Sequence, residues 1–238
     1  MGFFGFGKTT KVDKLTKKLR NAYSQTSERH VVMQQLAELG TEEAMTALLQ
    51  RFTYRTEASI VDEDEKETAY RYLVRGGDTA VAAIEAFLTQ SDAIYWPVKA
   101  LKDIAGIDRA VEVLLSALDR SEVVDQRVNE QKTQIVSNLR DFPHPEVQER
   151  LQTLSDDDDE DIRILAIDGL LTYGPEAALP YAARRLLDEG ESLRVKTVIL
   201  EQLIELDWSL SPWQAQIEEG PGLPVPYELA HDGKIRRV

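Results

Sequence analysis

The stretch DIRILAIDGLLTYGPEAALPYAARRLLDE, residues 161–189, decides the fold. Its apolar residues recur every three or four positions, a spacing that places side chains on one face of an α-helix. Gly174-Pro175 divides the pattern in two, because glycine ends helices and proline suits the first position of the next helix. The apolar positions are Ile164, Ile167, Leu170 and Leu171 before this turn, and Ala178, Leu179, Ala182, Ala183, Leu186 and Leu187 after it. The stretch therefore predicts a hairpin of two packed helices.

The same pattern recurs along the chain. One helical hairpin cannot bury its apolar face alone, but stacked hairpins share a continuous core. Turns between paired helices are predicted at Gly40, Gly76, Gly106, Pro143, Gly174 and Asp207, which lie 30 to 37 residues apart. We therefore predict an all-α fold, an α-solenoid or superhelix of about six helical hairpins.

Each predicted hairpin follows from the same periodicity and from polar caps. Ser27 is predicted to cap the first long helix and Thr41 its partner, with a polar connection from Thr53 to Asp62. The predicted helices cover 11–23, 28–39, 42–52, 63–75, 78–89, 94–105, 107–119, 125–140, 144–154, 162–173, 175–189, 192–206 and 208–217.

Three regions differ in composition. Residues 1–26 form a basic N-terminal segment with a capping helix, and residues 27–217 form the hairpin array. Residues 218–238 form a proline-rich tail, whose GPGLPVP stretch cannot be helical. The last twelve residues, YELAHDGKIRRV, form either a small hairpin around Asp232-Gly233 or a tail laid over the last helices.

The composition excludes several classes of protein. The chain has 238 residues, 42% of them hydrophobic and 29% charged, which is typical of folded globular proteins. It has no long apolar run and no signal-peptide pattern, so a cytoplasmic location is expected. Without cysteine it has no disulfide, thiolate metal site or cysteine nucleophile. The net charge of −14 argues against nucleic-acid binding, although the first twenty residues hold six basic residues and one acidic residue.

Two segments carry a resemblance to a known family. VKALKDIAGIDRAVEVLLSALD (98–119) and IRILAIDGLLTYGPEAALPYAARRLLD (162–188) resemble HEAT repeats, especially the short repeats of phycobilisome-lyase-like proteins. The resemblance covers about residues 28–206, and the second and fourth hairpins depart from the pattern. It implies a HEAT-like solenoid but no particular function, because function depends on the sites that a fold carries.

The N-terminus offers several interpretations. GFFGFGKT, residues 2–9, matches the phosphate-loop string, but that loop requires a preceding strand, so nucleotide binding is not expected. Phe3, Phe4 and Phe6 form either an aromatic cap on the first hairpin or part of a disordered terminus. Alternatively, together with the lysine-rich helix that follows, they dock on a membrane surface or a partner groove.

The acidic runs are interpreted as helix starts. SDDDDED, residues 155–161, lacks the alternating ligands and the glycine of a calcium loop, whereas Ser155 and the aspartates suit the N-terminus of the next helix. Asp62 to Glu65 is interpreted in the same way. The histidines His30, His144 and His231 show neither zinc-ligand spacing nor the His-Glu pairs of HEAT-like iron hydroxylases, so no metal or cofactor is predicted.

We predict a non-enzymatic protein–protein interaction scaffold or adaptor. If the HEAT resemblance holds, the second helices of the hairpins line an acidic concave face, which favours a protein partner with basic segments. The candidate partner-binding residues are Phe3, Phe4, Phe6, Arg109, Glu112, Glu149, Arg184 and Arg185. The alternatives are a lyase- or chaperone-like protein acting on a prosthetic group, and a peripheral membrane adaptor using residues 1–20.

Overall fold

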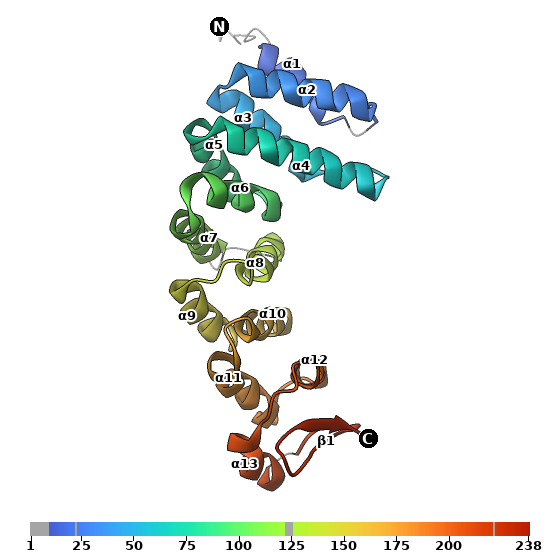
Figure 1. Ribbon diagram of the computed structural model, residues 1–238, viewed down its shortest axis with the longest axis vertical. Coiled ribbons are helices and arrows are strands. Elements are labelled where there is room, and N and C mark those ends of the chain that lie inside the picture. Colours follow the sequence, from blue (N-terminus) through green and yellow to red (C-terminus); the bar gives the residue numbers. More distant parts are fainter. Residues whose placement is uncertain (1–9, 22, 122–125, 221) are drawn as a thin grey trace, which may run out of the picture. The chain divides into compact units, whose positions relative to one another are not determined.

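The protein folds as helices joined by short turns (Figure 1). The computed structural model describes residues 10–21, 23–121, 126–220 and 222–238. These residues form thirteen α-helices, two short 3₁₀ helices and one two-stranded sheet, which confirms the predicted all-α class. The chain divides into two compact units, residues 1–134 and 135–238, here called the first and second unit.

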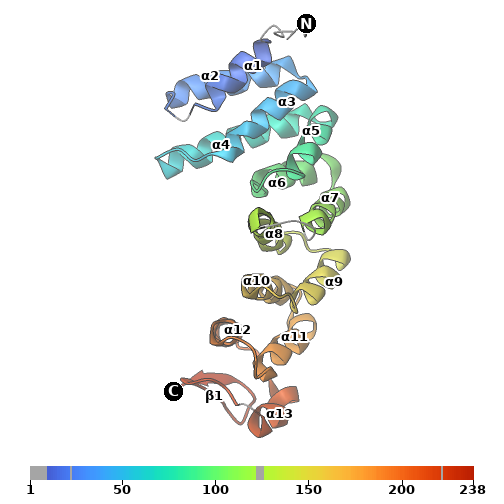
Figure 2. The same ribbon diagram turned by 180° about the vertical axis from the view of Figure 1, so that it is seen from behind.

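In the first unit, the helices pack in two rows. The elements are α1 (Lys11–Leu19), α2 (Thr26–Leu39), α3 (Glu42–Leu49), η1 (Gln50–Thr53), α4 (Ser59–Gly76), α5 (Asp78–Leu88), α6 (Tyr95–Ala105) and α7 (Ile107–Ser121). Helix α4 contacts α2 and α6, while α5 contacts α3 and α7. Figures 1 and 2 show α2 and α4 side by side. The first and second helices of successive hairpins therefore form separate rows.

The second unit is built in a similar way. Helix α8 (Gln126–Leu139) crosses into it from the first unit. The elements that follow are α9 (Pro145–Leu154), α10 (Glu160–Leu171), α11 (Pro175–Leu187), α12 (Leu193–Glu205), η2 (Ser211–Trp213), α13 (Gln214–Glu219), β1 (Tyr227–Leu229) and β2 (Ile235–Arg237). Helix α10 packs on α9, α11 and α12, and α11 also contacts α13.

Residues 161–189 form the expected hairpin, α10 and α11. Ile167, Leu170, Ala182 and Leu186 are buried between the helices of the second unit. The adjacent α9 approaches α10 closely at Gly169, where an added Cβ would lie 2.9 Å from Leu151 Cδ1. Apolar periodicity and one small residue thus decide how these helices pack.

Glycines form most of the turns within hairpins. Gly40, Gly106 and Gly174 have φ values of 61°, 90° and 93°, a backbone conformation that favours glycine. The second turn differs from the prediction by one residue, because Gly76 ends α4 and Gly77 has the positive φ of 55°. The Thr41 hydroxyl accepts a hydrogen bond from Ala44 N at 3.2 Å, which confirms it as an N-cap.

Some predicted boundaries are wrong. Ser27 does not cap α2, because the helix begins at Thr26, two residues earlier than predicted, and Gln25 occupies the N-cap position. The first helix ends at Leu19 rather than at residue 23. The connection from residue 53 is shorter than predicted, because α4 begins at Ser59. Propensity marks helix ends poorly where tertiary contacts extend or cut the helix.

Helix α1 packs its apolar stripe into the first unit. Val12, Leu15 and Leu19 are buried, and α1 contacts α2 and α3. Thr10 and Asp13 form a capping box at its start. The phosphate-loop string and Phe3, Phe4 and Phe6 lie outside the described residues.

The C-terminal segment forms a hairpin and also packs on a helix. Strands β1 and β2 pair antiparallel around the predicted Asp232-Gly233 turn, and β2 contacts α12. Tyr227 and Ile235 contribute to the core of the second unit. The predicted helix 208–217 is shorter than expected, because Ser209 bridges to Lys234 and α13 begins at residue 214. Among the described helices, none combines the length and the hydrophobicity that a membrane span requires.

Candidate binding site

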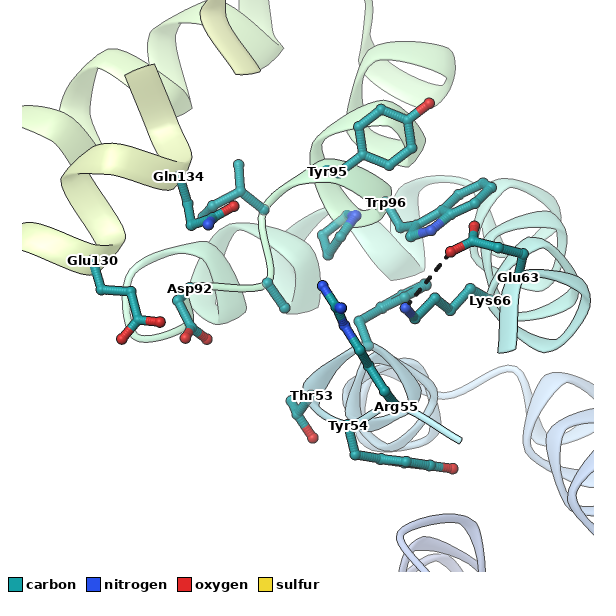
Figure 3. A pocket seen from close by; sticks show the side chains of 14 residues that line it. Thr53, Tyr54, Arg55, Glu63, Lys66, Asp92, Tyr95, Trp96, Glu130 and Gln134 are labelled. Atoms are coloured by element: carbon teal, nitrogen blue, oxygen red, sulfur yellow. Dashed lines mark ion pairs between the residues drawn. The ribbon is translucent and has the colours of Figure 1, made fainter. Parts of the chain in front are cut away.

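A hollow of about 460 Å³ lies at the start of α6 in the first unit (Figure 3). Its walls come from η1 and the chain after it, α4, the loop before α6, the start of α6, and the middle of α8. The polar and aromatic side chains that line it are Thr53, Tyr54, Arg55, Glu63, Lys66, Asp92, Tyr95, Trp96, Glu130 and Gln134. The hollow therefore combines an aromatic wall with charges of both signs.

The charges in the hollow are unevenly paired. Lys66 Nζ lies 2.6 Å from Asp62 Oδ2 and 3.9 Å from Glu63 Oε1. Arg55 reaches into the hollow in Figure 3, whereas Asp92 and Glu130 line another side of it. Within the described ranges, these last three side chains form no salt bridge with the protein. Their charges remain available to a ligand.

Behind the hollow lies a buried ion cluster, which we call the Glu65 cluster; it comprises Arg29, Arg51, Asp62, Glu65 and Lys66. The Glu65 carboxylate accepts hydrogen bonds from Arg29 Nη2 at 2.8 Å and Arg51 Nε at 2.7 Å. Arg51 Nη2 also donates to Asp62 Oδ1 at 2.7 Å. The side chains of Arg51 and Glu65 are fully buried. This cluster joins α2, η1 and α4, and its Lys66 reaches the hollow.

The pKa of Asp62 reflects this setting. Burial alone would raise it, but hydrogen bonds from Arg51, Lys66 and the backbone of Thr56 outweigh burial and lower the pKa to about 2. The carboxylate is therefore charged at neutral pH. Asp62 lies in the first turn of α4, as predicted for residues 62–65, but the helix begins at Ser59 and the side chains of Asp62 and Glu65 are buried.

A second feature, the aromatic cluster, consists of Tyr70, Tyr95, Trp96 and Lys99. The Trp96 ring lies 5.5 Å from the Tyr70 ring and 5.3 Å from the Tyr95 ring, between centroids. Lys99 Nζ lies 5.0 Å from the Tyr70 ring centre, 5.8 Å from that of Tyr95 and 5.0 Å from that of Trp96. The Tyr70 hydroxyl donates to Asp103, and this hydrogen bond, with burial, raises the pKa of Tyr70 to about 12. Tyr95 and Trp96 belong to both the cluster and the hollow.

Two more hollows adjoin the first. One of about 510 Å³ shares Thr53 and Asp92 with it and extends along α3 and α5. The next, of about 370 Å³, shares Ala86 with the second hollow and extends from α5 to α7. We call this series of three hollows the groove. Its second and third hollows follow α3, α5 and α7, the second helices of the hairpins in the first unit, whereas its first hollow lies beside α4, α6 and α8.

The predicted residues Arg109 and Glu112 line the third hollow. Arg109 Nη2 lies 2.7 Å from Glu85 Oε1, and its Nη1 lies 2.7 Å from Glu112 Oε2. The structure thus brings both residues to the groove as members of an ion-pair set.

The predicted residues of the second unit form another group. Arg184 pairs with Asp156, and Arg185 Nη2 lies 3.1 Å from the same carboxylate. Both arginines line a hollow of about 450 Å³ together with Trp213, whereas Glu149 is exposed on α9. The candidate residues therefore belong to different units, and Phe3, Phe4 and Phe6 are not described.

A second buried carboxylate lies near Arg185. Glu191 Oε1 accepts from Arg163 Nη2 at 2.7 Å, and Glu191 Oε2 lies 3.5 Å from Arg185 Nη1. We call Arg163, Arg185, Glu191 and Asp156 the Glu191 cluster.

The aspartate run is a helix start, as predicted. Asp159 is the N-cap of α10 and accepts a hydrogen bond from Asp161 N at 2.8 Å. Ser155 has a different role from the predicted one, because it is buried at the end of α9 and donates to Gln152 O at 2.7 Å. In the part of the chain that the structure describes, no group of three or more His, Asp or Glu is arranged to hold a metal ion.

Few features of the sequence indicate the hollow. Trp96 lies at the start of α6, and its ring packs beside that of Tyr70. Tyr54, Arg55 and Lys66 show no motif, and only the fold brings them to the side of α6. An aromatic pair at a helix start, Tyr95-Trp96, was the one available signal.

Comparison with known proteins adds no family, because no family model matches the chain and no curated protein matches its sequence.

Proposed function

We propose that the protein is a non-enzymatic protein-binding scaffold, with its helical hairpins stacked as a HEAT-like solenoid and a partner segment bound along the groove. The observation that carries this proposal is the series of three adjoining hollows, which share lining residues. The first hollow lies beside α4, α6 and α8, and the other two follow α3, α5 and α7. A continuous series of this kind suits an extended peptide, because successive side chains can enter successive hollows.

The chemistry of the first hollow supports the same proposal. Tryptophan, tyrosine and arginine dominate the binding energy of protein interfaces, and Trp96, Tyr95 and Arg55 all line this hollow. The net charge of −14 favours the approach of basic partners over acidic ones.

A blocked groove tests the proposal. Ala86 is exposed and lines two of the hollows, so an Ala86→Trp variant should fill the groove without disturbing the core. Ala105→Trp is the matched control, because Ala105 is exposed on α6 and lines none of the three hollows. Affinity capture at low salt, with mass spectrometry, should recover the same partner with the natural chain and the control and lose it with Ala86→Trp.

Two outcomes count against the proposal. Equal capture by the natural chain and Ala86→Trp would place the partner elsewhere. Recovery of no partner under gentle conditions would argue against a scaffold, and a coloured or metal-containing purified protein would favour the alternative of a lyase-like protein acting on a prosthetic group.

The membrane alternative has weaker support. The apolar stripe of α1 is buried in the first unit, so only its lysine face is free to meet a bilayer. Binding to anionic vesicles that is lost on deleting residues 1–9 would favour this alternative, and binding unchanged by that deletion would exclude an anchor there.

A further inference from the structure

We propose that Tyr70, Tyr95 and Trp96 form a site for a cationic side chain, which Lys99 occupies in the free protein and a lysine or arginine of the partner takes over. The proposal rests on the proposed scaffold function and names the chemistry of one partner residue.

The geometry of the rings suits a cation. A cation within about 6 Å of an aromatic ring centre is attracted by the negative face of the ring. Lys99 Nζ meets this limit for all three rings, at 5.0 Å, 5.8 Å and 5.0 Å. Tyr95 and Trp96 precede Lys99 by one helical turn on α6, and Tyr70 comes from α4, so two helices hold the rings in place.

Acidic groups reinforce this preference. Asp103 accepts a hydrogen bond from the Tyr70 hydroxyl at the edge of the aromatic cluster. Asp92 and Glu130 line the hollow to which Tyr95 and Trp96 belong. Arg55 reaches into the hollow and repels a cation there, whereas Lys66, beside Trp96, is paired with Asp62 and Glu63.

Lys99 can leave the rings at little cost. Its side chain is partly exposed and, among the described residues, forms no salt bridge. Attraction to aromatic rings at exposed sites corresponds to about a 2- to 5-fold change in an equilibrium constant. A partner residue held by the rest of the groove can therefore replace Lys99.

The test uses choline as the cationic probe and its neutral isostere 3,3-dimethylbutan-1-ol as the control, each titrated into the full-length protein. The readout is the indole N–H signal of Trp96 in NMR spectra, identified by its loss in Trp96→Phe. We expect choline to shift this signal while those of Trp208 and Trp213 stay in place, and the neutral isostere to leave it unchanged.

Two matched variants distinguish the loss of Lys99 from the rings from a general change in the charge of the protein. Lys99→Met and Lys102→Met remove one positive charge each from α6, and Lys99 Nζ lies 5.0 Å from the ring centre of Trp96. We expect choline to bind about 2- to 5-fold more tightly to Lys99→Met than to the natural protein, with little change for Lys102→Met.

Three results would overturn the proposal: no shift of the Trp96 signal even in Lys99→Met, an equal shift with the neutral isostere, or equal gains for both methionine variants. Each leaves the scaffold proposal standing, because partner capture and its loss in Ala86→Trp are measured independently of choline.

Discussion

The two units each contain a carboxylate held by two arginines, and the two clusters differ mainly in burial. In the Glu65 cluster, the side chains of Arg29, Arg51 and Glu65 are 3%, 0% and 0% exposed. In the Glu191 cluster, Glu191 is 1% exposed, but Arg163 and Arg185 are 14% and 15% exposed. A glutamate paired with two arginines is therefore fully buried in the first unit and lies at the edge of the fold in the second unit.

This difference in burial changes how much stability is lost when one member of each ion pair is removed. Removing one member of a fully buried pair leaves an uncompensated charge in a medium that cannot solvate it. At the edge, water and neighbouring acceptors compensate the remaining charge. The Glu191 cluster has such acceptors, because Arg163 Nη1 also donates to Asp157 O at 2.7 Å and Asp158 O at 3.0 Å.

The largest loss of stability is expected in the Glu65 cluster. Glu65→Gln keeps the size of the side chain but replaces the buried carboxylate that accepts hydrogen bonds from both Arg29 and Arg51 with a neutral amide, so we expect a loss of about 3–5 kcal/mol in the free energy of unfolding. Urea unfolding followed by circular dichroism measures it. A loss below about 1 kcal/mol would show that the cluster is hydrated and that burial does not separate the two clusters.

The pH dependence should come next in size. The folded state lowers the pKa of Asp62 from 3.8 to about 2, so its stabilisation is fully present above pH 4 and is lost as pH falls through about 2. A shift of this size corresponds to about 2 kcal/mol. Unfolding measured between pH 5 and 2 should show a shallower decline for Asp62→Asn than for the natural protein. Parallel declines would contradict the assignment.

A smaller loss of stability is expected in the Glu191 cluster. Glu191→Gln should cost about 1–2 kcal/mol, because Arg163 keeps its carbonyl acceptors and Arg185 keeps Asp156. The measurement is the same urea unfolding curve used for Glu65→Gln. Equal losses in the two variants would break the comparison.

The smallest change in stability is expected at Asp156, the exposed member of the Glu191 cluster. Asp156, 43% exposed, pairs with Arg184 and Arg185, and surface pairs contribute about 0–1 kcal/mol. Asp156→Asn should therefore change stability by less than 1 kcal/mol, and the change should vanish in 0.5–1 M salt, where the screening length is only about 3–4 Å. A large effect that persists in salt would mean that the cluster is more enclosed than its exposure indicates.

The contrast also shows how far sequence patterns reach. Apolar spacing and turn glycines predicted the hairpins, since positions such as Ile167 and Gly174 act through local geometry. Glu65 cannot be predicted as buried, because its partners Arg29 and Arg51 lie 36 and 14 residues away and because α4 begins earlier than the sequence pattern indicates, at Ser59.

The candidate site was predicted only in part. Arg109 and Glu112 line the third hollow of the groove, whereas Arg184 and Arg185 line a separate hollow of the second unit. The position of Lys99 over aromatic rings cannot be predicted from the sequence, because one of these rings, Tyr70, belongs to another helix. Pairings across helices depend on tertiary packing, which a periodic pattern does not specify.

The C-terminal hairpin has a consequence for self-association. A row of helices leaves an apolar face at its end, which a second molecule could cover. Here Tyr227 and Ile235 pack into the core beside α12, and the Tyr227 hydroxyl donates to Glu201. The chain thus covers this part of the surface of α12 with its own strands, and the covered part is not available for a second copy of the protein to extend the helical rows.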